Sequence, residues 1–160
     1  MAEGQRISIK EVDYQQDAAK EVFENQDVCI HLIGVLGSYG VRQEIYESVN
    51  VELTLRILKW CREADVKQFV FCSTLGVQGF GHRLVVEEEK YAPRNCYEKT
   101  KASAEKEIIA FCKDKKMQYT IIRPDFVYGP GDIRRVKMYQ NIKNSKFVLI
   151  TNGRSYLHCV

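Results

Sequence analysis

Short apolar runs alternate along this chain with longer segments in which apolar residues recur at helical spacing. Five runs are predicted as strands: Ile7–Val12, Val28–Ile33, Gln68–Cys72, Tyr119–Ile122 and Phe147–Ile150. Four segments are predicted as helices: Gln15–Asn25, Arg42–Ala64, Asn95–Lys115 and Arg134–Asn144. Because strands that alternate with helices build βαβ units, the pattern predicts an α/β domain with a parallel sheet.

The central strands narrow the fold further. VCIHLI and FVFC are apolar without the alternation of a half-exposed strand. Such strands belong to parallel sheets that helices cover on both faces. We therefore expect a layered α/β domain whose parallel sheet has helices on both faces, not a sandwich of two sheets.

The composition fits one domain spanning residues 1–160. Of the 160 residues, 45% are hydrophobic and 28% are charged, and a chain of this size forms one core. No apolar run reaches the roughly 20 residues of a membrane-spanning helix. Residues 1–14 alternate charged and apolar side chains, unlike a secretory signal, so we expect a cytoplasmic protein that does not bind a membrane.

The cysteines and one buried histidine predict no metal chemistry. Six cysteines lie far apart, without a Cys-x-x-Cys pair or a histidine at zinc-ligand spacing, so neither a metal site nor a disulfide framework is indicated. Cys29 and Cys72 lie in apolar runs, where a thiol acts as a small hydrophobic side chain. His31 lies in a similar run and is expected to be a hydrogen-bonded core residue.

Positive charge is concentrated near the C-terminus. Residues 132–160 hold six basic side chains and one acid, a net +5 in a chain of net charge +3. Such a patch could face a phosphate-bearing ligand or nucleic acid, although a solvated basic helix is the commoner explanation. Aromatic residues are sparse there, which makes a nucleic-acid partner unlikely.

Polar and flexible segments come directly after the predicted strands, at the sheet edge where parallel sheets bind ligands. Loops Gly34–Gly40 and Gly76–Pro93 both begin there, and Ser73-Thr74 ends a strand. Tyr97 and Lys101 are four residues apart on a predicted helix, so they share one face. An ammonium beside a phenol lowers the pKa of the tyrosine, which can then exchange protons with a hydroxyl or carbonyl group.

The order of these features resembles a known family. A strand ending in Ser-Thr, then Tyr-x-x-x-Lys, then Arg123-Pro124 and Tyr-Gly-Pro-Gly-Asp is similar to the extended short-chain dehydrogenases/reductases. Within them the chain looks most like the NAD-dependent epimerase/dehydratase branch, and the resemblance implies an α/β fold with a partial Rossmann-like, doubly wound parallel sheet. The resemblance implies an enzyme that acts on a nucleotide sugar with NAD or NADP, a small-molecule partner, and a homodimer or other self-association.

The resemblance also implies roles for individual residues. Tyr97 would be the acid/base, Lys101 its partner on the nicotinamide ribose, and Thr74 the hydroxyl that orients the substrate. Pro124 and Phe126 would lie against the nicotinamide, and Asp13 would approach the adenine. The implied cofactor-binding set is Asp13, Gly34, Ser73, Tyr97, Lys101, Pro124 and Phe126.

The chain departs from the family pattern in three places. The family's glycine-rich phosphate turn, which comes after its first strand, has no clear counterpart, although Gly34, Gly37 and Gly40 match its spacing. Residues 132–160 look like only the start of the substrate-binding part. Gln78 replaces the usual tyrosine. The resemblance to the middle of the family further implies that Val28–Ile33 is an exposed sheet edge, and exposed edges favour self-association.

Two other functions remain open on the sequence alone. The first is a reductase of a steroid-like or flavonoid-like alcohol, since such enzymes share the Tyr-x-x-x-Lys and Arg-Pro segments. The second is a non-catalytic module that binds nucleotide or RNA or assembles complexes. Glu105, four residues after Lys101, is expected to pair with it on the helix surface.

Overall fold

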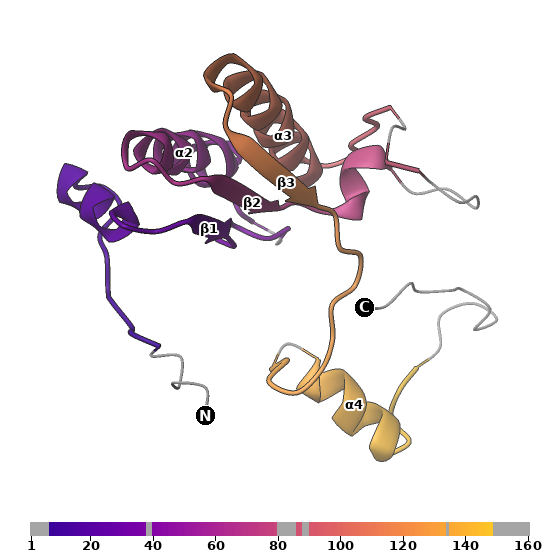
Figure 1. Cartoon of the computed structure of the whole chain (residues 1–160). Helices are drawn as coiled ribbons and strands as arrows, with labels where there is room; N and C mark the ends of the chain where they lie inside the picture. Colours follow the sequence, from indigo (N-terminus) through magenta and orange to yellow (C-terminus); the bar gives the residue numbers. More distant parts are fainter. Residues whose placement is uncertain (1–6, 38–39, 80–85, 88–89, 134, 149–160) are drawn as a thin grey trace.

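The centre of the molecule is a parallel sheet of three strands. A computed structural model describes residues 7–37, 40–79, 86–87, 90–133 and 135–148. In this part, β1 (Val28–His31), β2 (Gln68–Cys72) and β3 (Gln118–Ile122) lie side by side in the order β1-β2-β3 (Figure 1). Val28 lies opposite Gln68, which lies opposite Gln118. The predicted α/β class with a parallel sheet is confirmed.

One nearly continuous helix connects β1 to β2. It consists of α1 (Gln43–Glu47), the π-helical turn η2 (Ser48–Leu53) and α2 (Thr54–Glu63). The helix predicted over residues 42–64 is therefore present, with a wider turn at its centre that the apolar spacing did not indicate. Asn50, whose side chain is fully buried, lies in this turn.

The second connection holds the short 3-10 helix η3 (Leu75–Gln78) and the long helix α3 (Cys96–Lys115). Asn95 caps α3, because its side chain accepts a hydrogen bond from the Glu98 backbone at 2.9 Å. The Glu98 carboxylate in turn accepts from the Arg94 backbone at 2.6 Å. This reciprocal capping fixes the start of the helix that carries Tyr97 and Lys101.

Helices α2 and α3 lie on the same face of the sheet (Figure 1). Phe69 and Phe71 of β2 point to this face and have no exposed surface. They pack with helical side chains into the core: Ile57, Leu58, Trp60, Cys61, Ala104, Ile108 and Cys112. The alternation of buried and half-buried residues along β2 results from this one-sided cover.

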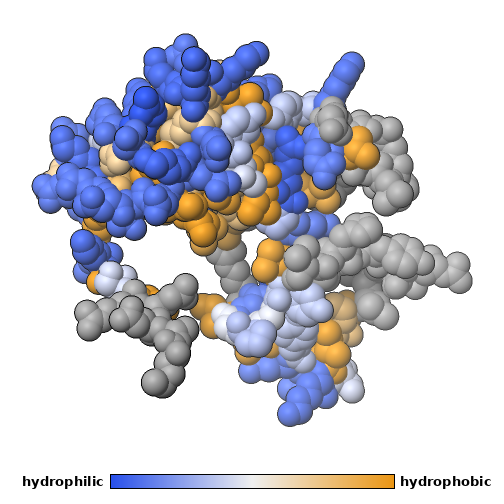
Figure 2. Space-filling view, in the orientation of Figure 1, coloured by the Kyte–Doolittle hydropathy of each residue, from blue (hydrophilic) through white to orange (hydrophobic). Residues whose placement is uncertain are grey.

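The opposite face of the sheet is largely uncovered in the described part of the chain. Val28, Ile30 and Ile122 share this face, with 47%, 64% and 49% of their surfaces exposed. Figure 2 shows apolar side chains gathered along the corresponding lower side of the main body. The outer edge of β1 is also unpaired among the described residues, as the resemblance implied.

Three terminal predictions differ from the structure. Ile7–Val12 is not a strand: Ile7 and Ile9 are almost fully exposed, and no described strand pairs with the segment, so its backbone lacks the ladder that stabilises a strand. Gln15–Asn25 forms a 3-10 helix, η1 (Asp17–Phe23), whose Phe23 packs on Trp60. Of the predicted strand Phe147–Ile150, the first two residues are in no strand, and the others lie outside the described residues.

The last helix lies away from the sheet. It is α4 (Val136–Lys143), within the predicted helix at 134–144, and none of its residues is buried (Figure 1). The described helices include none with the length and apolar character required to cross a membrane.

Candidate functional site

The carboxyl ends of β2 and β3 are tied together by backbone hydrogen bonds. Ser73, directly after β2, donates to the carbonyl of Ile122 at 2.7 Å, and Leu75 donates to the carbonyl of Pro124 at 3.2 Å. These bonds place the Ser73-Thr74 segment against the end of β3. The predicted meeting of strand ends at one edge is therefore present.

Tyr97 and Lys101 lie on consecutive turns at the start of α3, next to this edge. Tyr97 is half-buried, and the backbone of Gly37, in the loop after β1, lies beside it: a Cβ on Gly37 would be 3.7 Å from the Tyr97 Cβ. A Cβ on Gly34 would be 4.0 Å from Lys101 Nζ. The loop after β1 thus borders both side chains.

Lys101 is a buried cation, with only 4% of its surface exposed. Its Nζ lies 4.0 Å from the centre of the Phe71 ring. None of the hydrogen bonds or ion pairs among the described residues involves this ammonium. Burial lowers its pKa to about 8, although the negative charges of Cys72 and Glu105 act in the opposite direction.

The pKa of Tyr97 is raised, which is the opposite of the predicted direction. Burial is the main cause, and negative charge on Cys72 and Glu98 adds to it. The prediction rested only on the attraction of Lys101 for a phenolate, whereas removal of the phenol from water favours its neutral form.

Thr74 and Ser73 present hydroxyl groups at the end of β2. Thr74 Oγ1 caps η3 by accepting from the Gly76 backbone at 3.3 Å, which leaves its own proton available for a ligand. Ser73 is 4% exposed, and its Oγ is a buried polar side-chain atom without a hydrogen-bond partner in the described structure. An unsatisfied buried hydroxyl is unusual and calls for an explanation.

Asn50 is a site-supporting residue that sequence reasoning did not single out. Its amide accepts from the Val35 backbone at 2.8 Å and donates to the Val35 carbonyl at 3.1 Å. It also donates to Thr100 Oγ1 at 3.2 Å, and Thr100 donates to the Tyr97 carbonyl at 2.9 Å. The sequence signal for this role was a polar residue, Asn50, within an apolar helical stretch.

His31 is the core histidine that was predicted. It is 3% exposed, its Nε2 lies 2.9 Å from Thr54 Oγ1, and its ring stacks on Phe69 and Phe71. Burial, with the nearby Lys101 charge, lowers its pKa to about 4. His31 is therefore neutral at pH 7.

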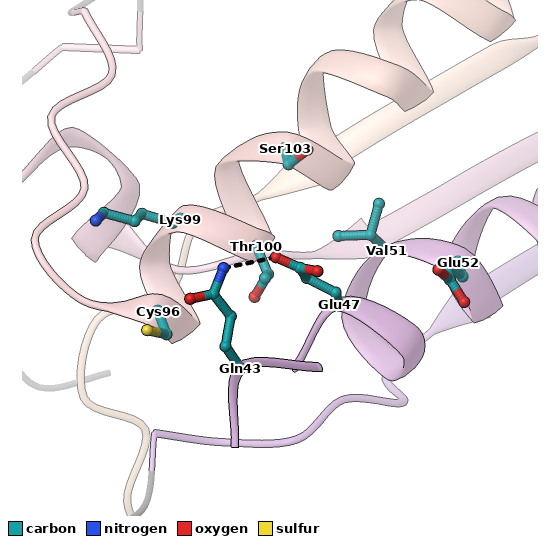
Figure 3. Close-up of a pocket in the computed structure, with 8 residues that line it drawn as sticks. All are labelled: Gln43, Glu47, Val51, Glu52, Cys96, Lys99, Thr100 and Ser103. Atoms are coloured by element: carbon teal, nitrogen blue, oxygen red, sulfur yellow. Dashed lines mark hydrogen bonds between the residues drawn. The ribbon is translucent and has the colours of Figure 1, made fainter. Parts of the chain in front are cut away.

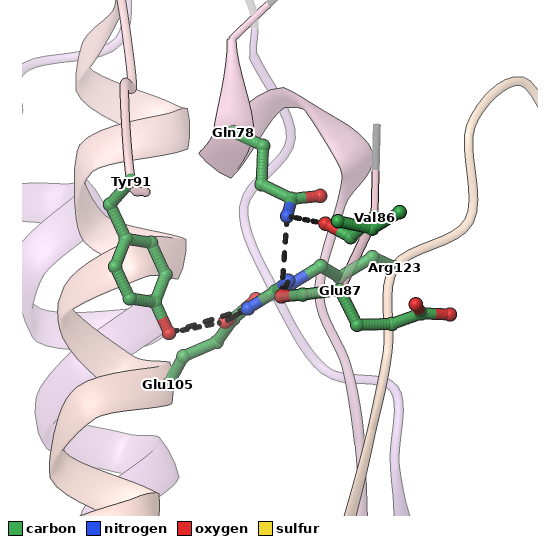
Figure 4. Close-up of polar contacts among 6 residues, drawn as sticks. All are labelled: Gln78, Val86, Glu87, Tyr91, Glu105 and Arg123. Atoms are coloured by element: carbon green, nitrogen blue, oxygen red, sulfur yellow. Dashed lines mark hydrogen bonds and ion pairs between the residues drawn. The ribbon is translucent and has the colours of Figure 1, made fainter. Parts of the chain in front are cut away.

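Glu105 does not pair with Lys101 on the surface, so that prediction is wrong. It is fully buried and binds Arg123 through both carboxylate oxygens, with a shortest distance of 2.6 Å to Nη2 (Figure 4). Tyr91 donates to the same carboxylate at 2.8 Å, and its pKa is raised to about 12 by burial and by this carboxylate. Arg123 also donates to the Glu87 carbonyl at 2.9 Å, which anchors the loop after η3.

Phe126 and Asp13, which were predicted to bind the cofactor, contact other residues of the chain in the structure. The Arg135 guanidinium lies 3.4 Å from the centre of the Phe126 ring, so it covers one face of that ring. The Asp13 carboxylate accepts from the Gln15 backbone and from the Gln16 side chain, both at 3.0 Å. The cofactor roles of both residues remain predictions.

A groove of about 420 Å³ lies away from these residues, between α1, η2 and the start of α3 (Figure 3). Gln43 donates to Glu47 at 2.7 Å on one wall, and Cys96, Lys99 and Ser103 line the other. Tyr97, Lys101 and Thr74 do not line it. In the described part of the chain, no group of three or more His, Cys, Asp or Glu residues could hold a metal ion.

Comparison with known proteins gives one family. The model of the NAD dependent epimerase/dehydratase family matches residues 2–158. The UDP-glucose 4-epimerase of Vibrio cholerae is 38% identical over 90 residues, which are 54% of this chain and 27% of that protein. The decarboxylating sterol-4-alpha-carboxylate 3-dehydrogenase of Candida albicans is 31% identical over 137 residues, 81% of this chain and 39% of that protein.

Solved structures agree with this result. The UDP-glucuronic acid 4-epimerase of Bacillus cereus, solved with NAD, has a TM-score of 0.76 and 25% identity, and the match covers 87% of this chain and 46% of that one. A UDP-N-acetylglucosamine 4-epimerase from Methanobrevibacter ruminantium shares the fold, with a TM-score of 0.78 at 23% identity. The chain spans less than half the length of each of these relatives.

Proposed function

Because this chain belongs to the NAD dependent epimerase/dehydratase family, we propose that it is the central part of an enzyme that acts on a nucleotide sugar with NAD or NADP. One observation carries the proposal. Lys101 holds a buried ammonium that has no acceptor in the described structure, one helical turn from Tyr97. A buried charge of this kind is costly unless a ligand supplies its partner.

The residues at the strand ends fit a dinucleotide. Lys101 Nζ and the unpartnered Ser73 Oγ can donate to ribose hydroxyls or to an amide group. Gly34 admits no side chain without pressing on Asn50 Oδ1, since its Cβ would lie 3.2 Å away, so a backbone surface is kept there. We assign these residues, with Tyr97, Pro124, Phe126 and Asp13, to the cofactor. NAD or NADP, when bound, supplies the hydride acceptor.

Three residues of the chain are assigned different roles in the proton transfer. Tyr97 is assigned to accept a proton from a sugar hydroxyl, because it is half-buried and lies one helical turn before Lys101 on α3. The Lys101 ammonium stabilises the phenolate form of Tyr97, which accepts the hydroxyl proton and becomes the neutral phenol. Thr74 donates its free proton to the same substrate oxygen and so fixes its orientation.

A sterol-type alcohol is the second candidate substrate. The sterol dehydrogenase of Candida albicans matches 81% of this chain, whereas the Vibrio cholerae epimerase matches 54% at higher identity. Gln78, in place of the family's usual tyrosine, donates to the carbonyls of Val86 and Glu87 and leaves the substrate wall different from the sugar-binding pattern. Thermal shifts with UDP-glucose and with a 3β-hydroxysterol separate the two candidates.

We also assign the outer side of α1, η2 and α3 to a homodimer interface, since the equivalent helices pair in the family that the sequence resembles. The groove of Figure 3 lies on this side. Sedimentation velocity of the wild-type chain and of Val51→Glu tests the assignment. A dimer that the substitution leaves intact contradicts it.

Calorimetric titration of the chain with NAD tests the proposed function itself. We expect binding by the wild type and by Tyr97→Phe, which keeps the ring but cannot transfer the proton. Lys101→Met should lower the affinity at least about tenfold, as expected for the loss of a charged hydrogen bond. Equal NAD affinity in the Lys101→Met variant, or none in the wild type, would refute the proposal for this chain.

A further inference from the structure

Three side chains form a stack beneath the candidate site. The Phe71 ring is fully buried and lies 4.0 Å from Lys101 Nζ. The His31 ring, on the neighbouring strand β1, stacks on Phe71 with the ring centres 5.9 Å apart and the planes 15° from parallel. Residues 31 and 71 are also register partners in the sheet. The ammonium therefore lies against an aromatic surface that both strands build.

Among the described residues, the Lys101 ammonium has this aromatic contact but no hydrogen bond or ion pair. The Glu105 carboxylate is already bound by Arg123 and Tyr91. His31 is neutral near pH 7. Burial raises the pKa of Tyr97 on α3, so its phenol is neutral near pH 7. Cys72 on β2 is the remaining ionisable neighbour of the ammonium. The negative face of an aromatic ring attracts a cation, and more strongly where water is excluded.

We propose that Phe71 is a positioning residue of the candidate site, whose ring face holds the Lys101 ammonium at the end of β2 while His31 supports the ring from β1. This inference rests on the proposed function, because it concerns the lysine assigned to Tyr97 and to the cofactor. An aliphatic side chain of similar size would fill the same space in the core. It would offer no negative face to the cation.

Phe69 provides a matched control. It lies two residues before Phe71 on the same strand, it is equally buried, and it also stacks on His31, with ring centres 5.8 Å apart. The described cation–ring contacts of Lys101 include Phe71 but not Phe69. Phe69→Leu and Phe71→Leu therefore remove the same atoms from the same core, and only the second removes the surface under the ammonium.

The test is a pH titration of Lys101 by NMR in the chain labelled with ¹³C-lysine. The Lys101→Met variant identifies the signal. In the wild type the pKa of Lys101 is about 8. We expect Phe71→Leu to lower it by about half to one unit, because the protonated form loses its contact with the ring, and Phe69→Leu to leave it unchanged. Cys72, Tyr97, Glu105 and His31 remain in both variants.

An equal shift in both variants, or no shift in Phe71→Leu, would overturn the inference. If Phe71→Leu does not fold, Phe71→Met and Phe71→Tyr decide: the first should lower the pKa of Lys101 and the second should keep it. NAD titrations of the same samples test the proposed function separately. Failure of the wild type to bind NAD refutes that function, whereas the lysine titration still decides whether Phe71 positions the amine.

Discussion

Glu105 stabilises the region behind the candidate site. Its buried carboxylate joins α3 to Arg123 at the end of β3 and to Tyr91 in the loop after η3. Substitution by leucine removes the carboxylate partner of the Arg123 charge, whose side chain is only 17% exposed. We expect a loss of about 3–5 kcal/mol in the free energy of unfolding, measured in urea.

Asp114→Ala is the control for this prediction, because it removes an ion pair with Lys115 whose side chains are more than half exposed. Its expected cost is below about 1 kcal/mol. Adding Arg123→Leu to Glu105→Leu should recover part of the lost stability. Equal effects of Glu105→Leu and Asp114→Ala would show that the buried pair is not a stabilising link.

His31 gives the fold a sensitivity to acid. Its pKa is 6.5 when free and about 4 in the folded chain, so the folded state binds the proton less well than the unfolded state. This contribution is present above pH 6.5 and is lost as the pH falls toward 4, by about 3 kcal/mol in total. In urea unfolding between these pH values, the free energy of unfolding should depend less on pH for His31→Phe than for the wild type.

Thr54→Val serves as the comparison for the histidine. It removes the hydrogen bond to His31 Nε2 but keeps the titrating ring. We therefore expect lower stability with the acid sensitivity retained. If the wild type and His31→Phe lose stability in parallel as the pH falls, other groups cause the acid response.

At the scale of the elements, η3 and α3 are in tight contact near the site. A Cβ on Gly76 would lie 2.9 Å from Glu98 Cγ. Glu98 cannot easily move, because its carboxylate caps the helix. Gly76→Ala should lower the stability by about 1–3 kcal/mol, as overpacking does, and lower the melting temperature in calorimetry.

Gly37→Ala is the matched control for Gly76→Ala. Its new Cβ would meet Tyr97 at 3.7 Å, an ordinary contact, and its φ is not in the left-handed region. Its effect on stability should stay within about 0.5 kcal/mol. If both alanine variants have the same melting temperature as the wild type, η3 is free to move away from α3.

The helices and strands also show which features could be predicted from the sequence. The spacing of Tyr97 and Lys101 and the hydroxyls after β2 were enough to predict that these side chains lie near one edge of the sheet, because helical and strand periods fix local faces. Their functional roles remain predictions. Glu105 was misassigned, since its partner Arg123 lies 18 residues away on another element. Ile7–Val12 has the composition of a strand, but strand formation depends on a neighbour that a local pattern does not reveal.

At the scale of the whole molecule, the uncovered sheet face is a second surface through which copies can associate, besides the helical side assigned to the dimer. Val28, Ile30 and Ile122 expose apolar surface beside the unpaired edge of β1. We expect the chain to self-associate through this face as its concentration rises. Ile30→Thr keeps a β-branched side chain but weakens that contact, so it should raise the monomer fraction in analytical ultracentrifugation.

Val136→Thr makes the same kind of change on α4, where the side chain is 45% exposed but away from the sheet. It should leave the association unchanged. A wild-type chain that stays monomeric at high concentration would count against an adhesive sheet face.

The π turn at Ser48–Leu53 changes the directions in which side chains point along the helix that connects β1 to β2. A π turn holds one residue more than an α turn, so it rotates α1 by about 100° relative to α2. Tyr46 and Ile57, eleven residues apart, would lie about 20° apart around a regular helix, and the turn shifts their directions to about 80° apart. Tyr46 therefore reaches the Leu36 carbonyl, while Ile57 packs in the core. Deleting one residue within the turn would restore a regular helix and keep the directions of α1 and α2, so the crossover should tolerate this shortening better than a deletion elsewhere along its length.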